Sequence, residues 1–318
     1  MRNIKKIIVA GLFLGLVLRS VSVFAVENES TEEFSEEAEE FLVQSEEKKV
    51  ENTRAQIMEE EYKEENIETA ESDAADSDYS YVYDEDTKVL TISGNGPLPD
   101  FRYDKFYDEV LAPWRFVIQK AVKIVIGDGI TGIGDYAFYR CESVKEIVIG
   151  NNVVSIGKCA FRKCYDLQKV TIGKCVREIE EYAFQSGSDE TPVSLYITDL
   201  VAWCKIKFAD GFSNPISGKV GKGFLYLNGE KVTEVVVPDS ITEIKYCTFA
   251  GMKNLRKVVL HNKVTRIGVS AFGGCSSLKD IKIPESVISI GGAAFAGCSS
   301  LTDIVFPEAI TGLEENMF

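Results

Sequence analysis

Apolar residues recur along most of the chain with a period of 23 positions. A phenylalanine marks each period, although 65 residues, which is not a multiple of 23, separate Phe184 from Phe249. Four of the phenylalanines follow an Ile-Gly pair and an alanine, as in Ile156-Gly157 and Ala160-Phe161. Self-similarity at this period predicts a repeat solenoid in which each coil covers the core of the next. The predicted core ladder consists of Phe138, Phe161, Phe184, Phe249, Phe272, Phe295 and Phe318.

The segment that follows each phenylalanine predicts a β-strand. In the run 280–283, period-two alternation sends Ile281 and Ile283 to one face and Asp280 and Lys282 to the other. Proline or glycine then ends the run, because the chain must leave the ladder there. We therefore expect residues 124–318 to form a mainly β solenoid with one parallel strand per 23-residue coil. The Ala-Phe section between strands is expected to form an irregular or 3₁₀-like turn.

One region inside the array breaks the period. At about residues 199–233 we expect an irregular insertion, with a short amphipathic helix containing Trp203 and then a small hairpin, still within one stack. The chain ends at Phe318, the ninth place of a coil. Because repeat arrays normally need a terminal cap, we expect either a continuation of the chain or a frayed last coil.

Residues 79–123 are expected to cap the front of the array. Apolar and polar positions alternate from Tyr81 to Ile92 across the turn at 84–87, which predicts a β-hairpin. Together with Ala112-Pro113-Trp114, this hairpin would shield the apolar ladder ends of the first coil from water.

The N-terminal part of the chain predicts a targeting segment and a spacer. Cations precede an apolar run from Ile7 to Leu18, and small residues precede position 26, so residues 1–25 are typical of a secretory signal cleaved after Ala25. The run is too short for a transmembrane anchor. Residues 26–78 hold 21 acidic and 4 basic side chains without a heptad pattern, which predicts a disordered or weakly helical linker. We expect a secreted or cell-surface protein that is not inserted in a membrane after cleavage.

Charge is concentrated in this linker rather than in the body of the protein. The formal net charge is −15, of which the linker contributes −17 and residues 1–25 contribute +4, which leaves −2 for residues 79–318. A nucleic-acid partner requires clustered cations that replace counterions along the phosphates. The sequence therefore predicts no nucleic-acid binding.

The repeat resembles that of the BspA-like leucine-rich repeat family of bacterial surface proteins. The family's repeats read Ile-Gly-x-x-Ala-Phe-x-x-Cys-x-x-Leu followed by a strand that ends in proline, and the resemblance extends from about Ile124 to Phe318. Glu180 in place of the glycine, and Gly187 and Met252 at the cysteine position, depart from this pattern. The resemblance implies a leucine-rich repeat solenoid and a role in adhesion or recognition at a surface.

The cysteines and the single histidine could in principle serve in catalysis or metal binding, but their sequence positions fit structural roles better. The cysteine column is expected to face inward as buried free thiols, although adjacent coils also bring Cys141 and Cys164, or Cys275 and Cys298, within disulfide range. The sequence lacks the Cys-x-x-Cys pairs typical of zinc sites. The single histidine, His261, has no nucleophile motif beside it. We therefore expect no enzymatic activity, no cofactor and no metal.

A stripe of outward-facing residues is the candidate binding surface. Its mostly β-branched side chains reflect either β propensity or a partner-binding sheet with an apolar seam and a charged rim. The sequence favours recognition of an extracellular protein or glycan. The alternative is an array that positions an absent catalytic module of a larger surface protein, and a self-associating surface layer is a third interpretation. The stripe consists of Val148, Thr171, Val236, Val259, Lys282 and Val305, flanked by Glu146, Lys169, Glu234, Lys257, Asp280 and Asp303.

Overall fold

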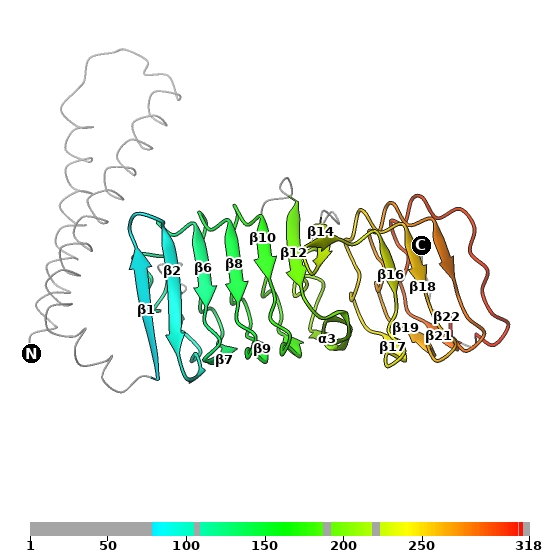
Figure 1. Ribbon diagram of the computed structural model, residues 1–318, viewed down its shortest axis with the longest axis horizontal. Helices are drawn as coiled ribbons and strands as arrows, with labels where there is room; N and C mark the ends of the chain where they lie inside the picture. Colours follow the sequence, from blue (N-terminus) through cyan, green and yellow to red (C-terminus); the bar gives the residue numbers. More distant parts are fainter. Residues whose placement is uncertain (1–77, 105–108, 187–191, 218–222, 311, 314–318) are drawn as a thin grey trace, which may run out of the picture. The chain divides into compact units, whose positions relative to one another are not determined.

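The computed structural model describes residues 78–104, 109–186, 192–217, 223–310 and 312–313. The chain divides into two units, Met1–Asp73 and Ala74–Phe318, and every described residue belongs to the second, which is a stack of β-coils (Figure 1). The predicted signal 1–25, almost all of the predicted linker 26–78 and the predicted core residue Phe318 lie outside the described residues. Among the described residues, no helix is both long and apolar enough to traverse a lipid bilayer.

The main sheet takes one strand from each N-terminal coil, and the predicted parallel solenoid is confirmed. Its strands alternate buried and half-buried residues because successive side chains point to opposite faces. Equivalent residues pair across coils, so that Ile124 lies beside Ile147 and Ile147 beside Val170. In pairing order the strands are β1 (Tyr79–Asp84), β2 (Val89–Gly94), β6 (Lys123–Ile126), β8 (Glu146–Ile149), β10 (Lys169–Thr171), β12 (Val193–Ile197), β14 (Gly223–Leu227) and β15 (Glu230–Lys231).

Each coil also contributes a second, shorter strand, which the sequence analysis did not anticipate. The isoleucine of the Ile-Gly motif lies in this strand, and Ile156 pairs in parallel with Ile179. The motif requires glycine because a Cβ on Gly157 would lie 2.6 Å from the backbone nitrogen of Asp135 in the preceding coil. In pairing order this sheet contains β13 (Lys207–Phe208), β11 (Glu178–Ile179), β9 (Ser155–Ile156), β7 (Ile130–Ile133) and β3 (Gly96–Pro97).

The C-terminal coils repeat this arrangement with sheets of their own. We call residues 123–186 the N-terminal stack and residues 234–298 the C-terminal stack. The C-terminal main sheet contains β16 (Glu234–Val236), β18 (Lys257–Val259) and β20 (Asp280–Lys282). Its second sheet contains β17 (Glu243–Ile244), β19 (Arg266–Ile267), β21 (Ser289–Ile290) and β22 (Gly312–Leu313). A separate hairpin pairs β4 (Tyr103–Asp104) with β5 (Glu109–Val110).

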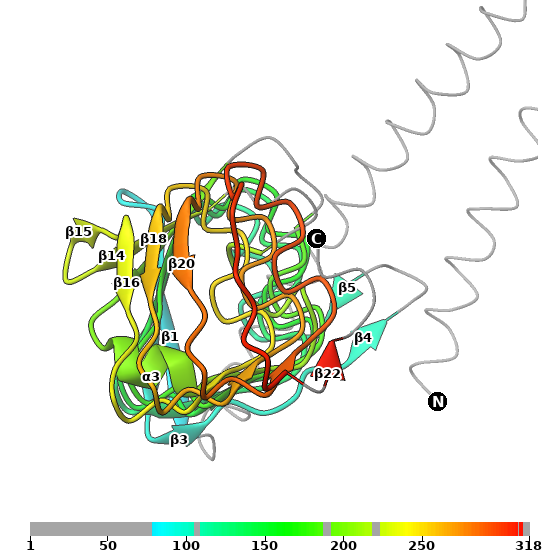
Figure 2. The same ribbon diagram turned by 90° about the vertical axis from the view of Figure 1, so that its right-hand side faces the viewer.

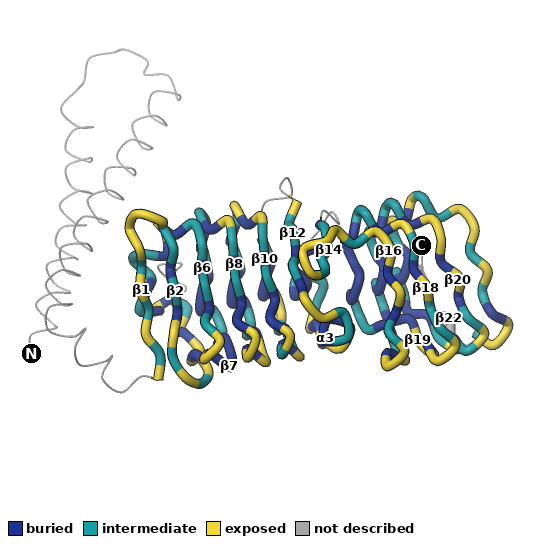
Figure 3. Tube along the Cα trace, viewed as in Figure 1, coloured by how far each residue is buried: buried dark blue, intermediate teal, exposed yellow. Residues whose placement is uncertain are grey.

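The phenylalanine rings form two aromatic ladders. In the N-terminal stack, the ring centroids of Phe161 lie 5.2 Å from those of Phe138 and of Phe184. In the C-terminal stack, the corresponding distances from Phe272 to its two neighbours, Phe249 and Phe295, are 5.6 Å. The predicted single spine is therefore interrupted between Phe184 and Phe249, although buried residues from both stacks belong to one hydrophobic core (Figure 3).

The predicted hairpin cap is present at the front of the array. Strands β1 and β2 pair antiparallel on either side of the predicted turn. Trp114 is buried and stacks on Phe138, with ring centroids 5.1 Å apart, and its Nε1 donates to the carbonyl of Ala137 at 2.8 Å. The ladder thus ends in an indole whose polar atom is satisfied, while Tyr79 and Tyr81 contact its edge.

The insertion supplies the junction between the two stacks. Helix α3 (Leu200–Lys205) begins at Asp199, whose carboxylate accepts from the backbone of Ala202 at 2.9 Å, which is a standard N-cap. Trp203 in α3 is buried and donates from Nε1 to the carbonyl of Thr248 at 2.9 Å. Asn214 Nδ2 donates to the carbonyl of Cys247 at 2.8 Å. These side chains, together with a backbone bridge between Gly223 in β14 and Met252, join the two stacks, although no described strand of one main sheet pairs with a strand of the other.

The expected hairpin follows the helix but is more integrated than predicted. Strands β14 and β15 pair antiparallel across the turn at Asn228-Gly229, where both residues have positive φ. Strand β14 also pairs in parallel with β12, so it extends the main sheet of the N-terminal stack. The hairpin stands outside the line of β16, β18 and β20 (Figure 2).

Each coil has a turn side on which the backbone adopts left-handed conformations at fixed positions. The first position, two residues before the phenylalanine, has φ between 53° and 59° and holds Tyr136, Cys159, Tyr182, Cys247, Ser270 and Ala293. The second, two residues after the phenylalanine, holds Arg140 and Lys163 in the N-terminal stack and Gly251, Gly274 and Gly297 in the C-terminal stack. The sequence pattern around each Ala-Phe pair is thus a turn, as expected.

Candidate binding surface

A row of side chains lines the solvent face of the main sheet. These residues occupy the outward positions of successive strands, and strand pairing places each directly beside the next. All of them are half-buried, since each is partly covered by its neighbours in the row. We call this set the outer row: Thr91, Val125, Val148, Thr171, Tyr196 and Tyr226.

A row of charges runs beside it. Glu146 lies between two lysines, with its Oε1 2.9 Å from Lys169 Nζ and 3.4 Å from Lys123 Nζ. Burial acts to raise the pKa of the Glu146 carboxyl, but the hydrogen bonds and charges of the two lysines outweigh it and hold that pKa below its usual value. One carboxylate shared by two ammonium groups leaves this part of the face with an excess of positive charge.

The outer row ends in Tyr196 and Tyr226, and Phe224 on β14 lies in the flanking row beside them. We call these three residues the aromatic cluster. The rings of Tyr196 and Tyr226 stack with centroids 4.5 Å apart and an interplanar angle of 10°. Lys169 Nζ lies 4.9 Å from the Tyr196 centroid, and Lys231 Nζ lies 3.6 Å from the Phe224 centroid. Both contacts are cation–π interactions, so each lysine helps to hold a ring in place.

The C-terminal part of the predicted stripe lies on a different sheet. Val236, Val259 and Lys282 are in register on β16, β18 and β20, and the two valines are 59% and 37% exposed. Lys257 Nζ lies 3.5 Å from Glu234 Oε1 in the flanking row. Val305 is 83% exposed but lies in a stretch without strand structure, so its assignment to the sheet was wrong.

The sequence analysis therefore found part of this surface and missed another part. It identified Val148 and Thr171 in the outer row but treated the six stripe residues as one column. The junction divides five of them between two sheets, and Val305 lies in neither. It missed the aromatic cluster because these residues lie where the 23-residue period fails. Alternation of apolar and outward residues in Val193–Ile197 and Gly223–Leu227 is the signal that could have revealed both strands.

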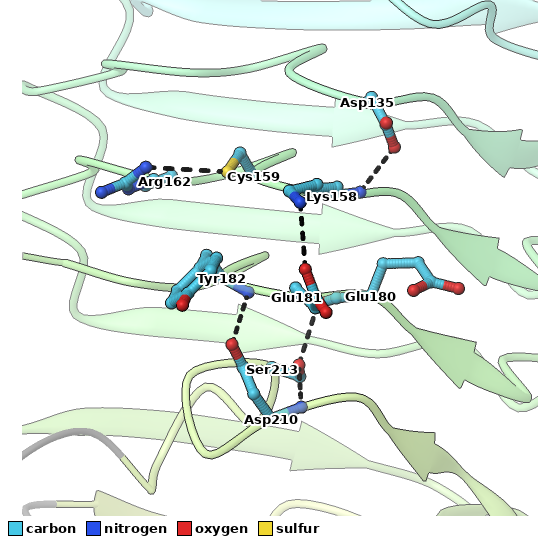
Figure 4. A network of polar contacts seen from close by, with 9 residues as sticks. All are labelled: Asp135, Lys158, Cys159, Arg162, Glu180, Glu181, Tyr182, Asp210 and Ser213. Carbon is cyan, nitrogen blue, oxygen red and sulfur yellow. Dashed lines mark hydrogen bonds and ion pairs between the residues drawn. The ribbon is translucent and has the colours of Figure 1, made fainter.

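A polar network on the turn side ties neighbouring coils together (Figure 4). The Asp135 carboxylate accepts from the backbone of Lys158 at 2.6 Å, and Lys158 Nζ lies 3.0 Å from Glu181 Oε2 in the next coil. Further along, Asp210 accepts from the backbone of Tyr182 at 3.1 Å. Burial, together with the nearby charge of Asp100, raises the pKa of the Asp135 carboxyl. These side chains satisfy backbone donors between coils, which is a structural role.

The turn side of the C-terminal stack is hollow by comparison. A shallow groove of about 570 Å³ lies there, and small residues form much of its wall because the bulky turn residues of the N-terminal stack have no counterpart. The groove is lined by Gly211, Ser217, Tyr246, Cys247, Ala250, Lys253, Ser270, Gly273, Gly274, Ser276, Ala293, Ala296 and Gly297.

The single histidine also has a structural position. His261 Nε2 lies 3.1 Å from the carbonyl of Pro238, and its Nδ1 accepts from the backbone of Lys263 at 3.2 Å. Both ring nitrogens therefore engage the backbone, one of them in the preceding coil. In the part of the chain that the structure describes, no group of three or more His, Cys, Asp and Glu residues is arranged to hold a metal ion.

All eight cysteines are free thiols, and most are buried. The thiols of Cys141, Cys275 and Cys298 donate to the phenylalanine carbonyls that line the column, for instance from Cys275 Sγ to Phe249 at 3.1 Å. Burial raises the pKa of the Cys298 thiol to about 11 and that of the Cys204 thiol to about 12. These groups act as small core residues with a weak donor.

Comparison with known proteins places the fold in a family. The profile of the BspA type leucine rich repeat region matches residues 115–198 and 222–318, in 6 copies, which is more than half of the chain. No curated protein matches the chain.

Several solved structures are similar. A leucine rich cell surface protein of Faecalibacterium prausnitzii is 20% identical over 76% of this chain and 84% of its own, with a TM-score of 0.37. A leucine-rich repeat protein of Eubacterium ventriosum is 19% identical over 74% of this chain and 90% of its own, with a TM-score of 0.31. The pneumococcal vaccine antigen PcpA is 15% identical over 74% of this chain and 75% of its own, with a TM-score of 0.38. The repeat profile, matched six times along the coils described above, shows that the chain belongs to the BspA type leucine-rich repeat family.

Proposed function

We propose that this protein is a binding or adhesion protein of the cell surface, which recognises an extracellular protein or glycan through the solvent face of its main sheets. The observation that carries the proposal is the outer row, in which six strands in register expose apolar and aromatic side chains beside paired charges. Contiguous apolar surface with a polar rim is typical of interaction sites. The family's association with bacterial surfaces, which the sequence resemblance implies, agrees with this role.

A triple substitution tests the proposal. The full chain is screened on an array of glycans and extracellular matrix proteins, beside a variant that carries Val148→Lys, Val236→Lys and Val259→Lys. We expect the variant to lose the binding of the parent chain, because Val148→Lys puts a charge into the outer row and the other two lysines put charges into the corresponding row of the C-terminal main sheet. Its fold should persist, since all three side chains point to solvent.

The matched control carries Val154→Lys and Ile288→Lys. These side chains are also apolar and exposed, at 47% and 53%, but they lie directly before β9 and β21, on the second sheets. The control should bind like the parent. Equal binding by the triple variant, or equal loss by the control, would remove the outer face as the site of recognition.

A further inference from the structure

We infer that the aromatic cluster is the centre of the binding face and that it takes an acidic polypeptide segment of a protein partner. This inference rests on the function proposed above. It specifies the class of partner, which that proposal gives only as a protein or a glycan. It is carried by the geometry of Tyr196 and Tyr226, by the two lysines that contact the cluster, and by the adjacent hairpin.

The rings of the tyrosine pair stand upright on the sheet. Their centroid separation of 4.5 Å is close to the spacing of adjacent strands, as expected for side chains that project straight outward from β12 and β14. Each ring covers one face of the other. Lys169 comes from β10, on the opposite side of Tyr196 from Tyr226, and its ammonium group covers the second face of that ring.

At Tyr196, where both ring faces are covered, this geometry favours contact with polypeptide over stacking with sugars. A sugar ring that stacks on an aromatic side chain needs an open ring face, whereas Tyr196 offers its edge and its hydroxyl. Rigid tyrosines with a polar tip are characteristic of the residues that dominate protein–protein binding. Because stacking and cation–π contacts already restrict these rings, little side-chain entropy remains to be lost on binding.

Charge around the cluster favours carboxylates on the partner. Lys169 shares the Glu146 carboxylate with Lys123. Lys231 is exposed and lies over the ring of Phe224, and among the described residues it forms no ion pair. An acidic segment would complement both lysines while its apolar side chains pack on the tyrosine edges.

The hairpin gives this surface a boundary. Strand β15 carries Lys231 beside Tyr226, and the Asn228-Gly229 turn joins the two strands at the end of the N-terminal sheet. Since the hairpin stands outside the line of the C-terminal strands (Figure 2), it closes one end of the face. A partner segment on the outer row would therefore meet the cluster and Lys231 together.

Binding of defined polymers to the full chain tests the inference. The probe is a fluorescent random copolymer of glutamate and tyrosine, and hyaluronan serves as a polymer whose carboxylates are carried on sugars. We expect the copolymer to bind in a salt-sensitive manner and hyaluronan to bind much more weakly. The Tyr196→Ala and Tyr226→Ala variants should each weaken copolymer binding by roughly tenfold or more, and Lys231→Ala by a few-fold.

The matched control is Lys263→Ala, which removes an exposed lysine that lies in a turn outside the main sheets, with its Nζ 3.2 Å from Asp239 Oδ2, and should leave copolymer binding unchanged. Thermal melting of each variant checks that the fold persists. Absence of copolymer binding, equal binding of hyaluronan, or unchanged binding by both tyrosine variants would overturn the inference. If the triple valine variant still loses ligands on the array while the tyrosine variants keep them, the inference fails and the proposed function stands.

Discussion

The N-terminal and C-terminal stacks share a 23-residue register but differ on their turn sides. At the second left-handed position the N-terminal stack has Arg140 and Lys163, whereas the C-terminal stack has glycine throughout. A left-handed conformation costs an L-residue about 1–2 kcal/mol and costs glycine nothing sterically. At this position the C-terminal coils thus avoid backbone strain and leave a groove, while the N-terminal coils accept strain and present long cationic side chains.

Truncation of one ladder phenylalanine in each stack is expected to have the largest effect on stability. Phe161→Ala and Phe272→Ala should each lower the free energy of unfolding by about 3–5 kcal/mol, because each removes a buried ring stacked between two others. Urea denaturation of the two variants measures the losses. A loss under about 1 kcal/mol in one stack would show that its coils are not held by the ladder.

Trp203→Phe tests whether the two stacks are coupled at the junction. The change keeps an aromatic ring but leaves the buried carbonyl of Thr248 without its donor, which should cost about 1–3 kcal/mol. Calorimetry should show that the two stacks of this variant unfold less cooperatively than in the parent chain. An unchanged single transition at the parent melting temperature would mean that this hydrogen bond does not couple them.

Exchanging residues at the second left-handed position addresses the strain directly. Gly297→Lys should lower stability by about 1–2 kcal/mol, since it puts a side chain on a backbone with φ of 73°. Lys163→Gly should change stability by less than about 0.5 kcal/mol, because relief of strain offsets the greater freedom of glycine in the unfolded chain. If chemical denaturation gives equal losses for both, the N-terminal turn is not strained.

The smallest effect concerns the charged rows. Because the folded-state pKa of Glu146 is depressed, its stabilising contribution is present above the unfolded-state pKa and is lost as the pH falls through the folded-state value. Glu146→Gln should therefore cost about 0.2–1 kcal/mol at neutral pH and nothing at about pH 3. Glu234→Gln, which removes the partner of only Lys257, should cost less. The free energy of unfolding of both variants, measured as a function of pH, checks this prediction. An equal loss of stability in the two variants would argue against the shared ion pair.

Much of the architecture follows from the sequence because the repeat is strict where the core is continuous. Phe161 and Phe272 could be placed in register from spacing alone, and Trp114 could be recognised as part of the cap. The second strand of each coil was missed because two residues, such as Ser155 and Ile156, are too few to show a period of two. Val305 was wrongly placed in a strand because apolar and polar residues alternate around it, although that stretch forms no strand.

The candidate surface was harder to predict than the fold. The outward valines can be recognised because each stands between two inward-facing apolar residues of a repeat strand. Tyr196 and Tyr226, in contrast, lie 30 residues apart in a segment without the repeat. Only the parallel pairing of β12 with β14 places their rings together. Contacts within an irregular coil depend on the path that the chain takes through it, and the 23-residue spacing of the repeats does not predict that path.

The separation of the two main sheets also bears on how such an array can change its length. Within a stack, duplication of one 23-residue unit would add a complete layer and move the following layers by about 4.8 Å, with every side-chain column preserved. At the junction, α3 has no counterpart in the neighbouring coils, and β14 already pairs with β12 on one side and with β15 on the other, so a duplicate inserted there would be left without a matching surface. Growth or loss of layers by genetic recombination is therefore tolerable within either stack but not across the junction, and the placement of Tyr196 beside Tyr226 of the hairpin would be inherited unchanged.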